Sequence, residues 1–317
     1  MKNSAKATIG ETLHKWGGPL LALVAFAAAI WLLHRELKDH SWQEIFGAIS
    51  ALPRSHVALA MFLTAINYSI LSGYDGLAVW YLRRPLHPSK IMLGAFIGYA
   101  MSHNFTWLLG GTTTRLRLYS SWGFSTVDVV KLFALIGLAF WTGYCALAGI
   151  VFLTNPMPIP EELHSPLQDT FWLGPILLGM LGAYLFACAL GKPIVFRSWR
   201  IDFPPLRLAI MQGIVAACDI LLLSAVMYVL MPPGVNVSYW RFVNVALLAL
   251  AAALISHVPG GVGVLEVTVL ELVPHDDPTA IFGSLLAFRA IFYLLPLLIA
   301  VAMLGGHELF AHSKGRK

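Results

Sequence analysis

Residues 256–266 read Ser-His-Val-Pro-Gly-Gly-Val-Gly-Val-Leu-Glu, and they interrupt a long apolar stretch that extends from residue 242 to residue 273. Proline removes a backbone donor and glycine adopts turn conformations readily, so we expect a helix to break here. A second interrupted apolar stretch, residues 91–111, has Ser-His at 102–103 and Gly-Gly at 110–111. Both stretches therefore place Ser-His shortly before a Gly-Gly break.

The composition around these breaks is that of a membrane protein. Of the 317 residues, 58% are hydrophobic and only 12% are charged, whereas a soluble domain has about 25% charged residues. Apolar residues run continuously instead of alternating, which excludes a transmembrane β-barrel. We expect one all-α polytopic membrane domain over residues 1–317. The net charge of +5 does not indicate nucleic-acid binding, because the basic residues lie in short loops between apolar stretches.

Stretches long enough to span a bilayer predict six full transmembrane helices. They lie near residues 18–34, 57–82, 128–153, 171–190, 207–231 and 280–304. Loops rich in Lys and Arg alternate with loops that are acidic or uncharged. The positive-inside rule then places both termini, residues 1–17 and 305–317, in the cytoplasm of a bacterial inner membrane.

This topology makes each interrupted stretch a re-entrant hairpin. Stretch 91–111 must enter and leave on the cytoplasmic side, and stretch 242–273 on the outer side. The order Asp, Ser-His, Gly-Gly then occurs twice in opposite orientations, in an inverted repeat of residues 57–153 and 207–304. Interrupted segments in two inverted halves indicate the binding site of a transporter. The alternative is that the Gly pairs only permit close helix packing.

Four elements of the sequence resemble one known family. They are Tyr74-Asp75, residues 102–119, the Pro-Gly-Gly-x-Gly-x-x-Glu element at 259–266, and residues 288–296. In this order they are similar to the lysylphosphatidylglycerol synthase transmembrane family, which includes the flippase half of the bacterial multiple peptide resistance factor. The resemblance implies movement of a phospholipid, or of a related anionic, aminoacylated or polyprenyl-linked lipid, between leaflets. It does not imply lysyl transfer, because in the bifunctional proteins that activity belongs to a soluble C-terminal domain, and we expect no such domain here.

Charged residues in apolar surroundings are the first candidates for a substrate site. Arg115 and Arg117 follow the first break, and an arginine can hold a lipid phosphate through two parallel charge-assisted bonds. Their alternative role is to retain the loop in the cytoplasm. Asp75 and Asp219 lie inside apolar helices, where a carboxylate costs about 2.5–3.5 kcal/mol and needs a partner. Each could bind a proton or an ion, or cap a broken helix.

Glu266 follows the second break at a position comparable with Arg115 after the first. We therefore expect an Arg115–Glu266 pair that bridges the hairpins and opens when substrate binds. Arg289, in the last helix, is an alternative partner for Glu266 or Asp219.

The remaining candidates lie at the breaks. His103, Asn104 and His257 could line the cavity or shuttle protons, or could satisfy backbone groups beside the breaks. The residues that form the breaks are Gly110, Gly111, Pro259, Gly260, Gly261 and Gly263. We expect these glycines to provide positive φ angles and close approach at the hairpin tips.

These features predict a lipid transporter whose hairpin tips meet near the middle of the membrane, so that the headgroup passes while the acyl chains stay in lipid. No metal-ligand spacing and no ATP-binding Gly-x-x-x-x-Gly-Lys-Ser/Thr motif is present, so we expect no cofactor, and transport that is passive or driven by an ion gradient. Two other classes are an integral-membrane lipid-modifying enzyme and a non-transporting subunit of a separate lipid synthase. Such a synthase is a possible partner besides the lipid, and a homo-oligomer is possible.

Overall fold

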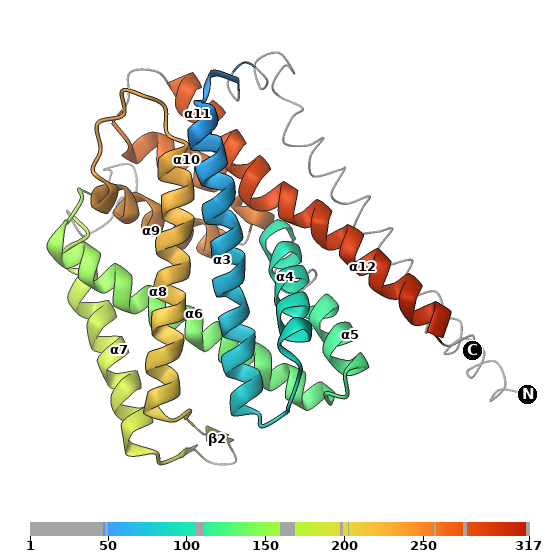
Figure 1. Cartoon of the computed structure of the whole chain (residues 1–317). Coiled ribbons are helices and arrows are strands. Elements are labelled where there is room, and N and C mark those ends of the chain that lie inside the picture. The colour runs from blue at the N-terminus through green and yellow to red at the C-terminus, as the bar shows by residue number, and fades with distance from the viewer. Residues whose placement is uncertain are drawn as a thin grey trace, which may run out of the picture.

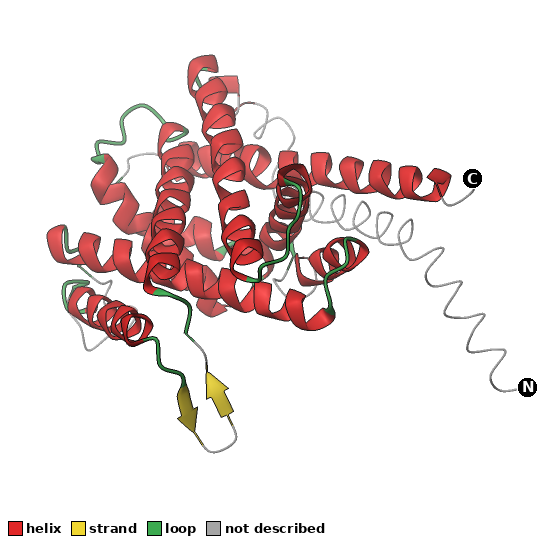
Figure 2. Ribbon diagram, turned by 60° about the horizontal axis from the view of Figure 1, so that its bottom comes forward, coloured by secondary structure: helices red, strands yellow, loops and turns green. Residues whose placement is uncertain are grey.

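The computed structural model describes residues 47, 50–105, 111–158, 169–196, 199–201, 203–256, 258–274 and 278–314. This part of the chain is a bundle of helices with one short two-stranded hairpin (Figures 1 and 2). The predicted helical fold class is therefore confirmed.

The structure contains helices of very different lengths and one pair of strands. In chain order they are α3 (Arg54–Tyr81), α4 (Pro88–Asn104), α5 (Thr113–Ser121), α6 (Thr126–Thr154), α7 (Leu173–Leu190), β1 (Ile194–Phe196), β2 (Trp199–Ile201), α8 (Leu206–Val229), α9 (Tyr239–Ser256), the 3₁₀ turn η3 (Pro259–Gly261), α10 (Val264–Leu272), α11 (Pro278–Phe288), the π-helical segment η4 (Arg289–Leu294) and α12 (Leu295–Lys314).

Six helices in the described part of the chain are long and apolar enough to cross a membrane. They are Arg54–Tyr81, Thr126–Thr154, Leu173–Leu190, Leu206–Val229, Tyr239–Ser256 and Pro278–Gly306, the last combining α11, η4 and most of α12. Five of them coincide with predicted spans. The predicted span 18–34 lies outside the described residues, and Tyr239–Ser256 is the first arm of the predicted second hairpin. The predicted C-terminal tail from residue 305 continues as helix to Lys314.

Proline sets the start of several of these helices. Pro53 and Pro205 immediately precede α3 and α8, and Pro88 and Pro278 are the first residues of α4 and α11. The fixed φ angle of proline suits the first turn of a helix. The missing N–H of proline costs nothing there, because the first N–H groups of a helix have no partner within the helix.

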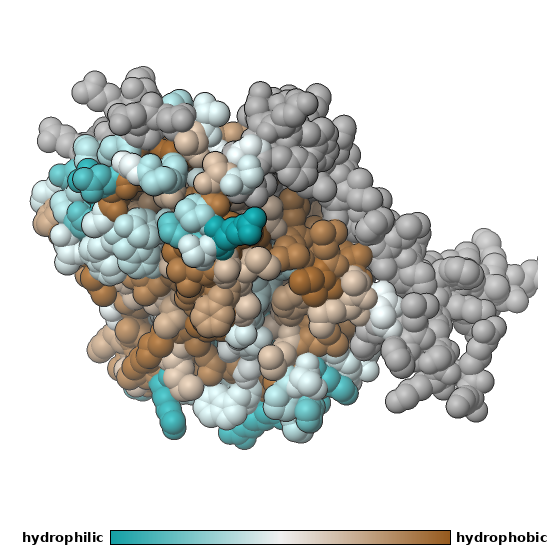
Figure 3. Space-filling view, turned by 45° about the horizontal axis from the view of Figure 1, so that its top comes forward, coloured by the Kyte–Doolittle hydropathy of each residue, from teal (hydrophilic) through white to brown (hydrophobic). Residues whose placement is uncertain are grey.

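The surface and the packing agree with a membrane-embedded bundle. Figure 3 shows a broad hydrophobic region between hydrophilic residues at two opposite edges of the molecule. Inside, α3 packs along α8, and α6 packs on α7 and α8. One core cluster joins α3 to α4, α5, α6 and α12, and a second joins α8 to α9, α10, α11 and η4.

Each core cluster contains one broken helix. In the first, α4 is followed by the nine-residue α5, and then by the 29-residue α6. In the second, α9 and η3 are followed by the nine-residue α10, and then by the 29-residue span Pro278–Gly306. The same order of a helix, a break, a short helix and a long helix therefore occurs at both interrupted stretches.

Gly143 permits the close approach of α6 to α8, and this generates a stability prediction. A Cβ atom at Gly143 would lie 2.3 Å from the Ala216 Cβ, so we expect Gly143→Ala to lower the free energy of unfolding by about 1–3 kcal/mol through overpacking. A Cβ atom at Gly137, in the same helix, would have nothing within 4 Å, so Gly137→Ala is the matched control and should be neutral or stabilising. Thermal unfolding of the detergent-solubilised protein measures both. Equal melting temperatures for the two variants would contradict this account of the α6–α8 contact.

Candidate functional site

A buried ion pair holds the first short helix against α3. The Arg115 guanidinium of α5 donates from Nε to Asp75 Oδ1 and from Nη2 to Asp75 Oδ2, both at 3.2 Å. Both side chains are almost completely inaccessible, with 1% and 0% exposure. Pairing two fully buried charges in this bidentate way removes most of the cost of placing either one in an apolar core.

Two tyrosines and a glycine complete this first pair. The Tyr119 hydroxyl, one turn after Arg115, donates to Asp75 Oδ1 at 2.7 Å. The Tyr99 ring of α4 lies under the guanidinium, with 4.2 Å between the Arg115 Cζ and the ring centroid. A Cβ at Gly98 would lie 2.6 Å from the same Cζ, so only glycine leaves room for the guanidinium beside α4.

A second buried ion pair holds the second short helix against the last membrane helix. The Arg289 guanidinium of η4 donates from Nε to Glu266 Oε1 of α10, and from Nη2 to Glu266 Oε2 at 2.9 Å. It also donates to the carbonyl oxygens of Gly260 and Gly261 at 3.0 and 3.2 Å. Glu266 Oε2 in turn accepts from the Gly263 N–H at 2.8 Å. One arginine thus fixes both the turn and the helix that follows it.

The second turn has the backbone conformation that its glycines predict. Gly260, Gly261 and Gly263 have φ angles of 63°, 61° and 79°, in the left-handed region that side chains with a Cβ rarely adopt. Gly111 serves close approach instead, since a Cβ there would lie 1.7 Å from the Ser102 Oγ.

The two ion pairs occupy matching positions but do not bridge the two broken segments. Arg115 and Glu266 are each the third residue of a nine-residue helix, and each is paired with an opposite charge from a longer membrane helix. The hypothesis of an Arg115–Glu266 pair is therefore wrong. It assumed that equivalent positions meet each other, whereas each charge is satisfied within its own core cluster. The alternative partner, Arg289, is confirmed for Glu266.

Asp219 is placed differently from the other acidic residues. It lies near the middle of α8, where its Oδ1 accepts from the Asn67 Nδ2 at 2.9 Å and its Oδ2 accepts from the Tyr74 hydroxyl at 3.0 Å. The Asn67 Nδ2 also donates to the Asp219 carbonyl oxygen at 2.9 Å. These contacts join α8 to α3 one residue away from Asp75.

The two broken helices meet at their tips. A Cβ at Gly260 would lie 3.2 Å from the carbonyl oxygen of His103 and 3.7 Å from that of Asn104, so η3 is in direct contact with the end of α4. The Tyr68 hydroxyl lies 3.3 Å from the His103 Nδ1 and donates to the Phe292 carbonyl oxygen. The end of α4, at the first interrupted stretch, is therefore in contact with the turn of the second interrupted stretch, while Gly110 of the first Gly-Gly pair lies outside the described residues.

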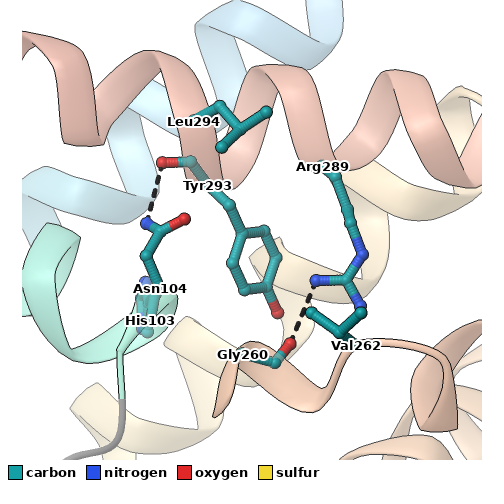
Figure 4. A pocket seen from close by; sticks show the side chains of 7 residues that line it. All are labelled: His103, Asn104, Gly260, Val262, Arg289, Tyr293 and Leu294. Atoms are coloured by element: carbon teal, nitrogen blue, oxygen red, sulfur yellow. Dashed lines mark hydrogen bonds between the residues drawn. The ribbon is translucent and has the colours of Figure 1, made fainter. Parts of the chain in front are cut away.

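A small pocket lies where the tips meet η4. Its lining consists of His103, Asn104, Gly260, Val262, Arg289, Tyr293 and Leu294 (Figure 4). The Asn104 Nδ2 donates to the Tyr293 carbonyl oxygen at 3.0 Å, and the buried Asn104 Oδ1 has no hydrogen-bond partner among the described residues. A π-helical segment leaves such carbonyl groups available, and these segments are frequent at functional sites.

The pocket is much smaller than a lipid headgroup. The space that the centre of a water molecule can occupy is about 10 Å³, which is close to the minimum for a single water. The polar groups at the tips are therefore packed against one another in this conformation.

The other predicted site residues are distributed as follows. Arg117 lies on α5, half-buried, and has a partner of its own. His257 and Gly110 lie outside the described residues. Within the ranges that the structure describes, no group of three or more His, Cys, Asp and Glu side chains is arranged to hold a metal ion.

Tyrosine and asparagine side chains at the site were missed by the sequence argument. Tyr68, Tyr99 and Tyr119 contact His103, Arg115 and Asp75, and Asn67 contacts Asp219. Helical spacing could have found two of them, because Tyr119 follows Arg115 by four residues and Asn67 precedes Tyr74 by seven, on one face of α3.

The Arg289–Glu266 pair predicts strong coupling in a double-mutant cycle. We expect Glu266→Gln and Arg289→Gln each to cost about 3–5 kcal/mol of stability, because each leaves a buried charge without its partner. The double variant should lose less than the sum, by about 0.5–3 kcal/mol. The exposed pair Arg84–Asp128 is the control, and its coupling should not exceed about 1 kcal/mol. Additive losses at Arg289 and Glu266, measured by unfolding in detergent, would contradict the pairing.

Comparison with known proteins places this architecture in a family. No family model matches the chain. It is 34% identical over 313 residues to the uncharacterized protein slr0712 of Synechocystis sp., covering 98% of this chain and 97% of the relative. It is 30% identical over 286 residues to the inner membrane protein YbhN of Escherichia coli, covering 89% of both chains. With its six candidate spans, this chain is an integral membrane protein that belongs to the family of the inner membrane protein YbhN.

Proposed function

We propose that this protein moves a phospholipid, or a related anionic, aminoacylated or polyprenyl-linked lipid, between the leaflets of the inner membrane. The observation that carries the proposal is the contact between the two broken helices at a pocket with buried polar side chains. Interrupted helices and ionisable residues at membrane depth are costly, and in membrane proteins they mark the routes of polar substrates. The resemblance to the lysylphosphatidylglycerol synthase transmembrane family names lipid as the substrate class.

In this proposal the two broken segments are re-entrant hairpins related by inverted symmetry. The matching helix order and the matching positions of Arg115 and Glu266 support the repeat. The headgroup passes between the hairpin tips, and the acyl chains remain in the bilayer beside them.

The residues around the pocket suit a lipid phosphate once the tips separate. Arg289 holds two carbonyl oxygens of the turn as well as Glu266, and separation of the tips from η4 exchanges some of these contacts for contacts to a phosphate oxygen. The Asn104 Oδ1, which accepts no bond from the described residues in the closed conformation, is available to a hydroxyl or ammonium group of the headgroup. Arg115 is the corresponding candidate at the first hairpin.

Leaflet exchange in liposomes tests this function. Purified full-length protein is reconstituted with a trace of fluorescent phospholipid, and a membrane-impermeant reductant bleaches the outer leaflet. We expect the wild type to make nearly all of the label accessible within the assay, and Asn104→Ala to slow exchange by about tenfold, the effect of one lost hydrogen bond to a charged group.

Asn244→Ala is the matched control for this test. Asn244 is also a buried asparagine whose Nδ2 donates to a backbone carbonyl and whose Oδ1 has no partner among the described residues, but it does not line the pocket. Its exchange rate should equal that of the wild type. Absence of exchange for every headgroup tried would refute the proposal, and formation of a chemically altered lipid without exchange would assign an enzyme instead.

Separation of the hairpin tips is a second requirement of the proposal. The closed pocket holds no more than about one water, so transport needs His103 to move away from Val262. Cysteines at these two positions, bridged by a short cleavable thiol reagent, should stop exchange, and cleavage of the bridge should restore it. The same reagent on either single-cysteine variant serves as the control. Undiminished exchange in the bridged protein would show that the headgroup does not pass between the tips.

A further inference from the structure

Asp219 carries a charge that its neighbours do not balance. The carboxylates of Asp75 and Glu266 are each paired with an arginine, whereas Asp219 receives hydrogen bonds only from the neutral groups of Asn67 and Tyr74. Among the described residues, no Lys, Arg or His lies within salt-bridge distance of Asp219. These three carboxylates are thus accompanied by two guanidinium groups.

The groups that face Asp219 from the surrounding helices leave this imbalance unchanged. Four tyrosines lie around the carboxylate, Tyr68 and Tyr74 of α3, Tyr99 of α4 and Tyr293 of η4, and a phenol is neutral near pH 7. His103 of α4 is bonded to Tyr68, and the nearest titratable neighbour on α8 is Cys218.

The other helices that pack on α8 place no charged side chain beside Asp219. Gly143 of α6 packs on Ala216, one turn before Asp219, so the adjacent Tyr144 and Cys145 are the titratable residues of α6 there. Helix α7 contributes Tyr184 and Cys188. Helix α9 has no titratable residue after Arg241 at its start, and α11 has none.

An unbalanced carboxylate at membrane depth is stable in two ways, by binding a cation or by accepting a proton. The amide of Asn67 favours the second. Its buried Oδ1 has no hydrogen-bond partner in the described part of the chain, while its Nδ2 donates to the carboxylate. If Asp219 is a carboxylic acid, rotation of this amide turns its oxygen toward the acid, which then donates to it. The residue pair therefore has a bonding arrangement for each protonation state.

We propose that Asp219 accepts a proton from one side of the membrane and releases it to the other in each transport cycle, so that a proton gradient drives lipid movement. This inference rests on the proposed function and names its coupling ion. The carboxylate binds the proton at an Oδ atom, and the same proton leaves to water when the charged form is restored.

The connection from Asp219 to the hairpins runs along α3. Protonation changes the bonds to Asn67 and Tyr74, and Tyr74 is followed directly by Asp75, which holds Arg115 of the first hairpin. Tyr68, on the face of α3 that carries Asp75, contacts both His103 and the carbonyl oxygen of Phe292 in η4. A shift of α3 against α8 therefore acts on both sides of the pocket.

Infrared difference spectroscopy of the full-length protein in liposomes tests proton uptake without any transport assay. We expect the wild type to show a pH-dependent carboxylic-acid carbonyl band that Asp219→Asn abolishes and Asp219→Glu shifts. Asp128→Asn, which removes a carboxylate paired with the exposed Arg84, should leave the band intact. A band that persists in Asp219→Asn overturns the assignment of the proton to this residue.

Leaflet exchange under an imposed pH gradient tests the coupling. We expect the gradient to raise the wild-type rate by about fivefold or more, the lower range of coupling between two sites, and to leave Asp219→Asn unaffected. Size-exclusion profiles and the Asp219→Glu variant show whether the fold is retained. A wild type that responds to a sodium gradient and not to pH overturns the proton as coupling ion. If no lipid exchanges at all, the proposed function fails, while the infrared titration still decides whether Asp219 binds a proton.

Discussion

The pairing of buried charges is the constraint on which the rest of this structure depends. Lipid solvates neither ions nor open backbone groups, so a guanidinium inside the bundle must be matched by a carboxylate within hydrogen-bond distance. Arg115 and Arg289 are matched in this way, and each ties a short helix to a long one. The broken segments are therefore fixed by electrostatics where continuous backbone hydrogen bonding ends. The turn at Gly260 depends on this directly, because Arg289 also satisfies its carbonyl oxygen.

In the proposed transport cycle, the same constraint governs how the site opens and closes. A charge that is released from its partner in an apolar core needs another partner at once, and a polar headgroup entering between the hairpin tips is such a partner. Closure of the tips without substrate restores the original pairs and leaves space for only about one water. In this conformation the protein thus has no open polar channel between α4, η3 and η4, where such a channel would leak ions and leave backbone groups unsatisfied.

Much of this arrangement could be predicted because apolar stretches and helix breaks can be recognised in the sequence without knowledge of spatial contacts. Apolar stretches of bilayer length gave five of the spans, and the Gly-Gly pairs located both breaks. Pairing in space could not be derived in the same way. The sequence argument paired Arg115 with Glu266 because both follow a break. Which charges meet, however, is set by how the helices pack. Gly98 leaves room for the Arg115 guanidinium on the side of α4 that faces Asp75. The tyrosines could not be predicted as site residues because aromatic residues are common in any membrane helix. Only its hydrogen bond to Asp75 distinguishes Tyr119 from the other tyrosines.

The contrast between the two central aspartates follows from the same physics. Asp75 and Asp219 occupy similar places in the sequence of the two halves, each in the long helix before a broken one. Asp75 is locked by three hydrogen bonds, two of them from an arginine, and only its charged form can accept all three in full. Asp219 accepts side-chain bonds from two neutral donors, and no arginine among the described residues is paired with it. Two carboxylates in equivalent positions can therefore take different roles. The paired one holds α5 against α3, and the one bonded to neutral donors is the one that we propose to change its charge.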